Sequence, residues 1–466
     1  MGKVRILNNS IFYLLLLLTA LTAIPYGTVE PWWIAVFECL VFALAILALV
    51  EAFISRTLRF PAPSLLVPLL VLTLFILGQS LSFLSAKDAA GVISMDDSIS
   101  ADPYNSRLFA LKLFALITAG ALLLRYTDRK VRLRALVYLV IGVGVASALF
   151  ALFRKNTQSG PTFFLPNLPI DDRTFGQFIN KNHFAFLMEM SLGPTLALFL
   201  TGLRKRWRVF ILVPIAALLW TALVISNSRG GVMGSLCELL FLGVMLDPVG
   251  YLSRKYESET IPEGRRRVQA TVGGLVVRGI LITALIVVFG YGVAWIGGEP
   301  VVNNFQSATT DFGTSGALNN ANTSRKQMWA MSWRVFKDHP LAGIGFGGYW
   351  IAVTKYHDAS GELTPQQAHN DYLDLLAAGG LIGLALVIWF VVVFILRARE
   401  RLRLPDPFCR AARLGALAGI FGVAIHSFLD FGLHVTINAL VFVALIVIAT
   451  AGVSYTEKEI GIPIQS

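Results

Sequence analysis

Apolar runs long enough to cross a membrane recur along the whole chain, and short polar breaks separate them. A bilayer core roughly 30 Å thick requires about 20 apolar residues in each helix that crosses it. In keeping with this pattern, 56% of the 466 residues are hydrophobic and only 14% are charged. So apolar a chain leaves too little polar surface for a soluble domain. The sequence therefore predicts an all-α fold, a polytopic bundle of transmembrane helices.

About twelve runs fit this length. The expected spans are 10–27, 31–55, 63–81, 106–125, 133–153, 183–203, 209–227, 230–247, 272–297, 370–396, 411–430 and 435–455. The first run follows Lys3 and Arg5, as the apolar part of a cleaved signal peptide would. No clear small-residue cleavage site follows it, which favours a membrane anchor over a signal peptide.

Lysine and arginine predict the orientation of the bundle. Most of the 39 basic residues fall in breaks that face inward if the N-terminus is cytoplasmic, with dense groups at 125–134, 204–208 and 397–413. The positive-inside rule then places both termini in the cytoplasm. The net charge of +11 follows mainly from this bias. It therefore gives no reason to expect a nucleic-acid partner.

The outward face holds the longest polar stretch, the loop 298–369. Within it, "TSRKQMWAMSWRVFKDHP" predicts a helix that is capped by Thr323 or Ser324 and closed by Pro340. The glycines of "LAGIGFGGYW" predict a close-packed turn, because no βαβ pattern surrounds them. Two regions are expected on this basis, an N-terminal one at 1–182 with about five spans and a second one at 183–466 that includes the loop.

The stretch "QQAHNDYLDLLAAGGLIG" places ionisable residues where the chain enters a span. Thr364 and Pro365 predict a helix that begins before the membrane and continues through His369. The positive end of that helix disfavours imidazolium, so His369 would stay neutral and able to accept a proton. Asn370, Asp371 and Asp374 could orient it or bind a substrate hydroxyl. The alternative is an interfacial histidine bonded to a backbone carbonyl.

Two arginines add charge at membrane depth on the same side. Arg229 lies in the short outward break "ISNSRGG", and Arg325 begins the helix predicted in the long loop. Charges at this depth usually face the bundle interior or a wet cavity and mark function. Otherwise, Arg229 and Arg325 extend to the headgroups while Trp329 belongs to an interfacial aromatic belt.

Further polar groups are expected to face the same compartment. They are Lys181, Asn182, His183, His426, Asp430 and His434. They show no metal-ligand spacing, so polar lining is favoured and neither a metal nor a cofactor is expected. The carboxylate pairs Asp96–Asp97 and Asp171–Asp172 leave a divalent-ion alternative open.

These groups together indicate one type of reaction. Guanidinium groups bind a diphosphate in forked geometry, and a neutral histidine can activate a hydroxyl. An outward site has no access to nucleotide sugars, so the expected reaction is glycosyl transfer from a lipid diphosphate. The expected catalytic residues are His369, Arg325 and Arg229. The expected substrate-binding residues are Asn370, Asp371, Asn182, His183, Lys181, Trp329 and Asp430.

At these residues the chain resembles the O-antigen ligase and O-antigen polymerase superfamily. The resemblance covers roughly the half from the sixth span onward. It rests on "NKNHFAFL", "SNSRGG", "SRKQMW" with "DHPLAGIGFGGY", and "HNDYLDLLAAGGLIG". It implies a metal-independent, inverting glycosyltransferase of the GT-C type at the periplasmic face of the bacterial inner membrane. Region 183–466 would be its ligase-like domain.

The resemblance also implies roles for the substrates. An undecaprenyl diphosphate-linked glycan would be the donor, bound by Arg229 and Arg325, and His369 would deprotonate the acceptor hydroxyl. The acceptor would be lipid A core in a ligase and a second lipid-linked repeat unit in a polymerase, and the shared motifs do not separate these two. A flippase for the same lipid and a metal-dependent transferase are the competing classes. The flippase is disfavoured because no two similar halves are seen.

Overall fold

The computed structural model describes residues 2–57, 61–81, 98–157, 173–201, 206–246, 325–356, 366–403 and 406–453, together with Leu168 and Thr283. Within these ranges the chain contains helices and no β-strand, apart from an isolated bridge between Phe175 and Phe178. The helices are α1 (Gly2–Leu21), α2 (Pro31–Ser55), α3 (Pro63–Gln79), α4 (Pro103–Tyr126), α5 (Lys130–Thr157), α6 (Lys181–Thr201), α7 (Arg206–Ile225), α8 (Arg229–Met245), α11 (Arg325–Asp338), α12 (Tyr349–Ala352), η1 (Val353–Tyr356), α13 (Asp371–Leu402), α14 (Pro407–His426), η2 (Gly432–His434) and α15 (Thr436–Thr450).

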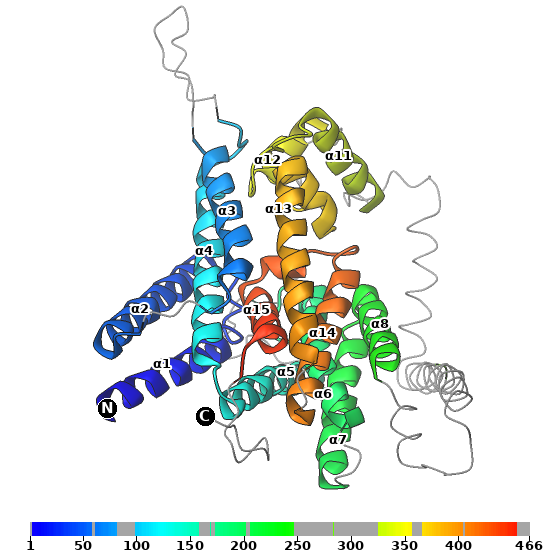
Figure 1. The fold of residues 1–466 in the computed structure, drawn as a ribbon. Coiled ribbons are helices and arrows are strands. Elements are labelled where there is room, and N and C mark those ends of the chain that lie inside the picture. The colour runs from blue at the N-terminus through cyan, green and yellow to red at the C-terminus, as the bar shows by residue number, and fades with distance from the viewer. Residues whose placement is uncertain are drawn as a thin grey trace, which may run out of the picture.

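The all-α prediction is confirmed for this part of the chain. Seven of its helices are long and apolar enough to cross a membrane, and Pro63–Gln79, Val209–Ile225 and Thr436–Thr450 are shorter apolar helices. Each predicted span has a helix at its place except 272–297, which lies outside the described residues. Figure 1 shows these helices gathered into one bundle, with α11 and α12 together at one end of it.

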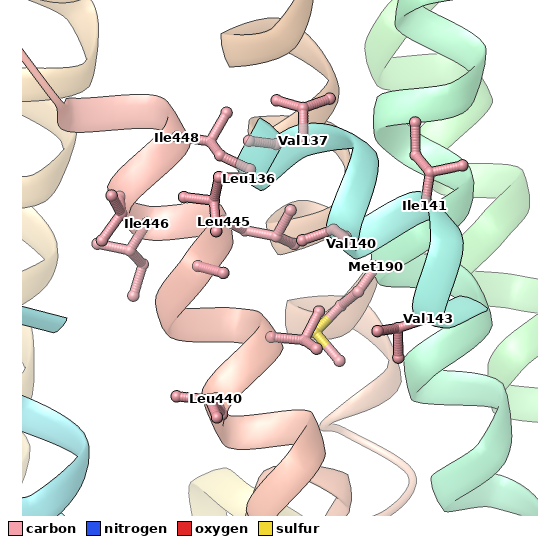
Figure 2. Packing of buried hydrophobic residues seen from close by; sticks show 14 of the residues in the cluster. Leu136, Val137, Val140, Ile141, Val143, Met190, Leu440, Leu445, Ile446 and Ile448 are labelled. Atoms are coloured by element: carbon pink, nitrogen blue, oxygen red, sulfur yellow. The ribbon is translucent and has the colours of Figure 1, made fainter. Parts of the chain in front are cut away.

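Helix α6 forms the centre of the bundle and packs against α14, α7, α8 and α5. It approaches α14 so closely that a Cβ at Gly193 would lie 2.6 Å from the carbonyl oxygen of Gly415. On another side of α6, Leu136 and Val140 of α5 lie near Leu445 of α15, with Met190 of α6 beside them (Figure 2). Small residues at helix contacts and branched side chains between them are how membrane helices pack without a hydrophobic driving force.

Helix α13 is not the single straight span that the sequence predicts at 370–396. Gly380 has φ +59° and ψ −157°, so the chain breaks there into two helical pieces. The backbone N–H of Leu381 donates to the carbonyl of Pro340 (2.8 Å) instead of bonding within its own helix. A Cβ at Gly380 would collide with the backbone of Leu341, so only glycine fits this break. The first piece thus reaches the site at an angle set by the turn that follows α11.

The predicted close-packed turn is confirmed in that segment. Gly343, Gly345 and Gly347 all have positive φ, and the N–H of Ile344 donates to the carbonyl of Ala377 (3.0 Å). The spacing of Gly379 and Gly383 is typical of glycines that let a neighbouring helix approach. In the structure the side chain of Phe346, from the turn, lies against both.

Ion pairs and polar bonds gather the basic residues at the end of the bundle away from α11. Lys130 contacts Asp406 (2.5 Å), Arg125 contacts Glu51 (2.9 Å), and Arg132 donates to Asn8 (2.5 Å). The N-terminal end of α1 lies at this end in Figure 1. The helices thereby separate a basic end from the end that carries His369.

Candidate functional site

His369 lies outside the helix in which it was expected. Helix α13 begins at Asp371, and Asn370 is its N-cap, with Oδ1 accepting from the backbone N–H groups of Tyr372 (3.0 Å) and Leu373 (3.1 Å). The prediction that a helix continues through His369 is therefore wrong. The helix begins only at Asp371, because the Asn370 side chain caps its first backbone N–H groups. His369 has φ +48°, a strained value for a residue with a Cβ. It still stands at the positive end of α13.

Asp430 connects the ends of two other helices to His369. Its Oδ1 lies 3.3 Å from His369 Nδ1 and 3.8 Å from His183 Nε2, and its Oδ2 accepts from the Asn182 side chain. Asp430 follows α14, whereas Asn182 and His183 belong to the first turn of α6. Asp430 is fully buried, but the His369 side chain is 30% exposed. One buried carboxylate thus faces two imidazoles, of which His369 is open to a substrate.

Backbone and ring contacts hold His369 from two further directions. The indole Nε1 of Trp329 donates to the His369 carbonyl (3.4 Å). The Phe431 ring meets both His369 (4.7 Å between ring centroids) and His183 (4.8 Å) edge to face. Trp329 belongs to α11, so the long outward loop contributes directly to the position of His369.

Arg325 begins α11, but its side chain lies outside the described residues. Its backbone is four residues before Trp329, and residues four apart lie on the same face of a helix. Because the Trp329 indole donates a hydrogen bond to the His369 carbonyl, this face of α11 lies toward His369. Figure 1 shows α11 above the first piece of α13.

Arg229 is the first residue of α8 and is half-buried. The hydroxyl of Ser228 caps this helix by accepting from the N–H of Gly231 (3.2 Å). A Cβ at Gly230 would collide with the ring of His426, the last residue of α14. The start of α8 therefore lies against the end of α14, four residues before Asp430. Lys181, the first residue of α6, donates its N–H to the carbonyl of Arg173 (2.7 Å).

His426 was expected to line the outward groove, and this expectation is wrong. The His426 side chain is 1% exposed, and its Nδ1 lies 2.8 Å from Oε1 of the fully buried Glu189. The Phe186 ring stacks on it at 4.0 Å. Gly230 of α8 leaves room for the ring there, because a Cβ at this position would lie 2.2 Å from Cδ2 of His426.

On the other side of Phe431, His434 faces the two aspartates in the first turn of α13. Its Nε2 lies 3.7 Å from Asp371 Oδ1 and 3.7 Å from Asp374 Oδ2. The Lys112 ammonium donates to the His434 carbonyl (2.7 Å). Burial, and secondarily the charge of Lys112, lower the pKa of His434 to about 3, so its imidazole is neutral at physiological pH.

Several ionisable side chains inside predicted spans were not among the expected site residues. Among them are Lys112, Glu189 and Glu238. A charged residue within an apolar run was the signal that could have marked them. Lys112 and Glu189 bond groups of other segments, and neither carboxyl oxygen of Glu238 has a hydrogen-bond partner among the described residues. Such surroundings could not be read from each residue's own segment.

No group of three or more histidine, cysteine, aspartate or glutamate side chains in the described ranges could hold a metal ion. The pairs Asp96–Asp97 and Asp171–Asp172, which carried the divalent-ion alternative, fall outside those ranges.

Comparison with known families gives one match. Residues 214–388 match the model of the O-antigen ligase family. The matched stretch includes α8, α11 and the first piece of α13, the elements that begin at or beside Arg229, Arg325 and His369. A search of curated proteins found no match to the chain. The match identifies an O-antigen ligase family segment at residues 214–388 and supports the resemblance of the chain to the O-antigen ligase superfamily.

Proposed function

We propose that the protein is an O-antigen ligase-like glycosyltransferase with His369 as its general base. It transfers a glycan from undecaprenyl diphosphate to a hydroxyl of lipid A core at the periplasmic face of the inner membrane. The observation that carries this proposal is the contact between His369 and Asp430. A partly open histidine held against a buried carboxylate is the arrangement that a hydroxyl-activating base requires.

The geometry suggests which nitrogen takes the proton. Asp430 lies beside Nδ1 of His369 at 3.3 Å, which favours the tautomer that carries its hydrogen on Nδ1. Nε2 is then the acceptor nitrogen, directed away from Asp430. When Nε2 receives the hydroxyl proton, the Asp430 carboxylate stabilises the imidazolium that forms. Asp430 therefore acts as a positioning residue.

The atoms and charges of the transfer step balance without a cofactor. The acceptor oxygen forms a bond to the anomeric carbon from the face opposite the diphosphate, and its proton passes to His369. The bond between the anomeric carbon and the diphosphate oxygen breaks, and its electron pair leaves with undecaprenyl diphosphate. Attack from the opposite face inverts the configuration.

Two arginines are proposed to bind the departing diphosphate. Arg229 lies at the N-terminus of α8, where backbone N–H groups and the helix dipole already favour an anion. Arg325 begins α11, whose Trp329 holds the His369 backbone. Forked guanidinium donors from the starts of these two helices would bind the diphosphate.

The separation of charge along the bundle supports a periplasmic site. The basic end defined by Arg125, Lys130 and Arg132 lies away from His369. If the positive-inside rule holds for this bundle, that end faces the cytoplasm and His369 faces the periplasm.

Product analysis tests the proposal. Purified protein is incubated with an undecaprenyl diphosphate-linked oligosaccharide, either with lipid A core or without a second acceptor. We expect glycosylated core only in the first mixture. Longer lipid-linked chains in the second mixture would instead establish a polymerase of the same superfamily. Movement of the donor across a vesicle membrane with no new glycosidic bond would establish a flippase and overturn the proposal.

A further inference from the structure

A second group of polar side chains lies beside the base. It is formed by Asp371 and Asp374 from the first turn of α13 and by His434 from the segment between α14 and α15. His434 Nε2 is 3.7 Å from a carboxylate oxygen of each aspartate. We call these three side chains the acidic pocket.

The acidic pocket contains polar atoms that the described part of the protein leaves unsatisfied. Asp374 is 8% exposed, and its Oδ1 has no hydrogen-bond partner there; Oδ2 of Asp371 has none either. A buried carboxylate oxygen without a partner costs about 1–3 kcal/mol or more, so such atoms are normally satisfied. The His434 side chain is 27% exposed, so the pocket is open on one side. Buried acceptors beside an opening indicate a ligand that supplies hydrogen-bond donors.

The wall between the acidic pocket and the base is a single aromatic ring. Phe431 lies edge to face with His369 (4.7 Å between centroids) and with His434 (5.9 Å). Phe109 of α4 borders the pocket on the far side, 6.1 Å from the His434 ring. A molecule that reaches from His369 to His434 would therefore pass across the edge of Phe431.

The acidic pocket and Arg229 lie on different sides of the base. The pocket is joined to α4 through Lys112, which donates to the His434 carbonyl. Arg229 begins α8, which packs against α14 and α6, whereas α4 packs against α3, α2 and α15. Figure 1 shows α4 and α8 on opposite sides of α14 and α15. The diphosphate and the ligand of the pocket would thus approach His369 from different directions.

We propose that the acidic pocket binds hydroxyl groups of the acceptor sugar, whose reacting hydroxyl lies at His369. This inference rests on the proposed function, and it assigns Asp371, Asp374 and His434 to the acceptor and not to the donor. The acceptor, unlike the donor, must touch the base through its nucleophilic oxygen.

The chemistry of the pocket selects hydroxyl groups. The three side chains of the pocket supply two carboxyl groups and a neutral imidazole and no cation, so they offer no charge partner for the donor diphosphate. Neutral His434 can exchange hydrogen bonds with a sugar hydroxyl without adding charge. The rings of Phe431 and Phe109 give apolar surface for the C–H face of a pyranose. Lys112 positions the segment through a backbone carbonyl and leaves the pocket chemistry to the three side chains.

Acceptor and donor kinetics test the assignment. In Asp374→Asn and Asp371→Asn, we expect the KM for the acceptor to rise about 10- to 100-fold, because each variant replaces a carboxyl oxygen that binds the acceptor. The KM for the donor should stay within about twofold. Asp338→Asn is the matched control, since Asp338 bonds only Tyr356 at the exposed end of α11. A rise in the donor KM by the same factor would assign the pocket to the donor and overturn the inference.

A binding measurement separates this inference from the proposed function. The catalytically impaired His369→Ala protein is titrated with two probes, core oligosaccharide released from lipid A and the soluble repeat-unit oligosaccharide. We expect one probe to bind, and Asp374→Asn in the same background to weaken that binding at least tenfold, whether or not transfer is observed. Unchanged binding, or Mg²⁺ binding that Asp374→Asn removes, contradicts the inference. His434→Gln replaces the aspartate variants if their melting curves show that they do not fold.

Discussion

Of the histidine–carboxylate contacts near this end of the bundle, the pairs of His426 and His369 differ mainly in what surrounds them. The inner pair joins His426 to Glu189 at 2.8 Å, with side chains 1% and 0% exposed. The outer pair joins His369 to Asp430 at 3.3 Å, and its histidine is 30% exposed. Both contain the same chemical groups. Only the outer pair can contact a substrate. The two pairs therefore differ in their access to solvent and not in their residue types.

Glycines close the inner pair. Gly230 and Gly231 of α8 have no side chain to hold that helix away from His426 and Glu189, and Gly234 lies against the second oxygen of Glu189. The outer pair instead lies where the ends of three helices meet, since α6 and α13 begin there and α14 ends there. Trp329 of α11 contacts the same place. Helix ends leave backbone groups and space that the middle of a bundle fills.

The largest expected effect is that of removing the outer histidine. His369→Ala should lower the transfer rate by about 10²- to 10⁴-fold, because no other side chain replaces the base. Donor binding and the melting temperature should stay near those of the wild type. The rate is measured as glycosylated core formed with saturating substrates. Near-wild-type turnover in this variant would remove His369 from the mechanism.

The arginines come next. Arg229→Ala or Arg325→Ala should cost about 10²- to 10³-fold in rate, since each forked donor stabilises charge that develops on the leaving diphosphate. Lysine at either position should restore activity only partly, because it keeps the charge and loses the fork. The double variant should lose less than the two single losses combined. Strict additivity, or full rescue by lysine at both positions, would mean that the two do not share a diphosphate.

A smaller loss is expected at the carboxylate of the outer pair. Asp430→Asn keeps the shape of the side chain but cannot stabilise an imidazolium, so the rate should fall about 10- to 100-fold, the worth of a charge-assisted hydrogen bond. The split between kcat and the two KM values is the specific readout. Loss of the positioning carboxylate should lower kcat and leave the KM values for donor and acceptor within about twofold. An unchanged kcat in a folded variant would show that Asp430 has a structural role only.

The inner pair should affect stability more than chemistry. His426→Ala leaves Glu189 buried without its partner, which typically costs about 3–5 kcal/mol of folding stability. Replacing both, as in Glu189→Leu with His426→Phe, should recover much of that loss. Melting in detergent measures the stabilities, and the transfer rate of each folded variant is compared with that of His369→Ala. A folded His426 variant that is as inactive as His369→Ala would erase the distinction between the pairs.

The smallest expected effect is that of chelation. Excess EDTA should leave the transfer rate within about twofold of its untreated value if the arginines neutralise the diphosphate in place of a metal. Loss of activity with recovery on adding Mg²⁺ or Mn²⁺ would point instead to Asp96, Asp97, Asp171 and Asp172.

The residue order determined much of the fold. Hydrophobic length is a local property, so the helices of the described ranges appear where their apolar runs lie. The turn at Gly343 and Gly345 was also foreseeable, because positive φ is a property of glycine itself. The types of residue at the outward helix ends were visible in the same local way.

Only the tertiary structure decided how those ends meet. The pairing of His369 with Asp430 depends on four segments converging, and the break at Gly380 depends on the Pro340–Leu341 backbone supplying bonds to α13. His426 shows the limit most clearly, since its neighbours in sequence are those of an outward hairpin while its ring lies inside the bundle. A side chain's partner and access to solvent are set by the packing of distant helices, and hydropathy along one segment carries no information about that packing.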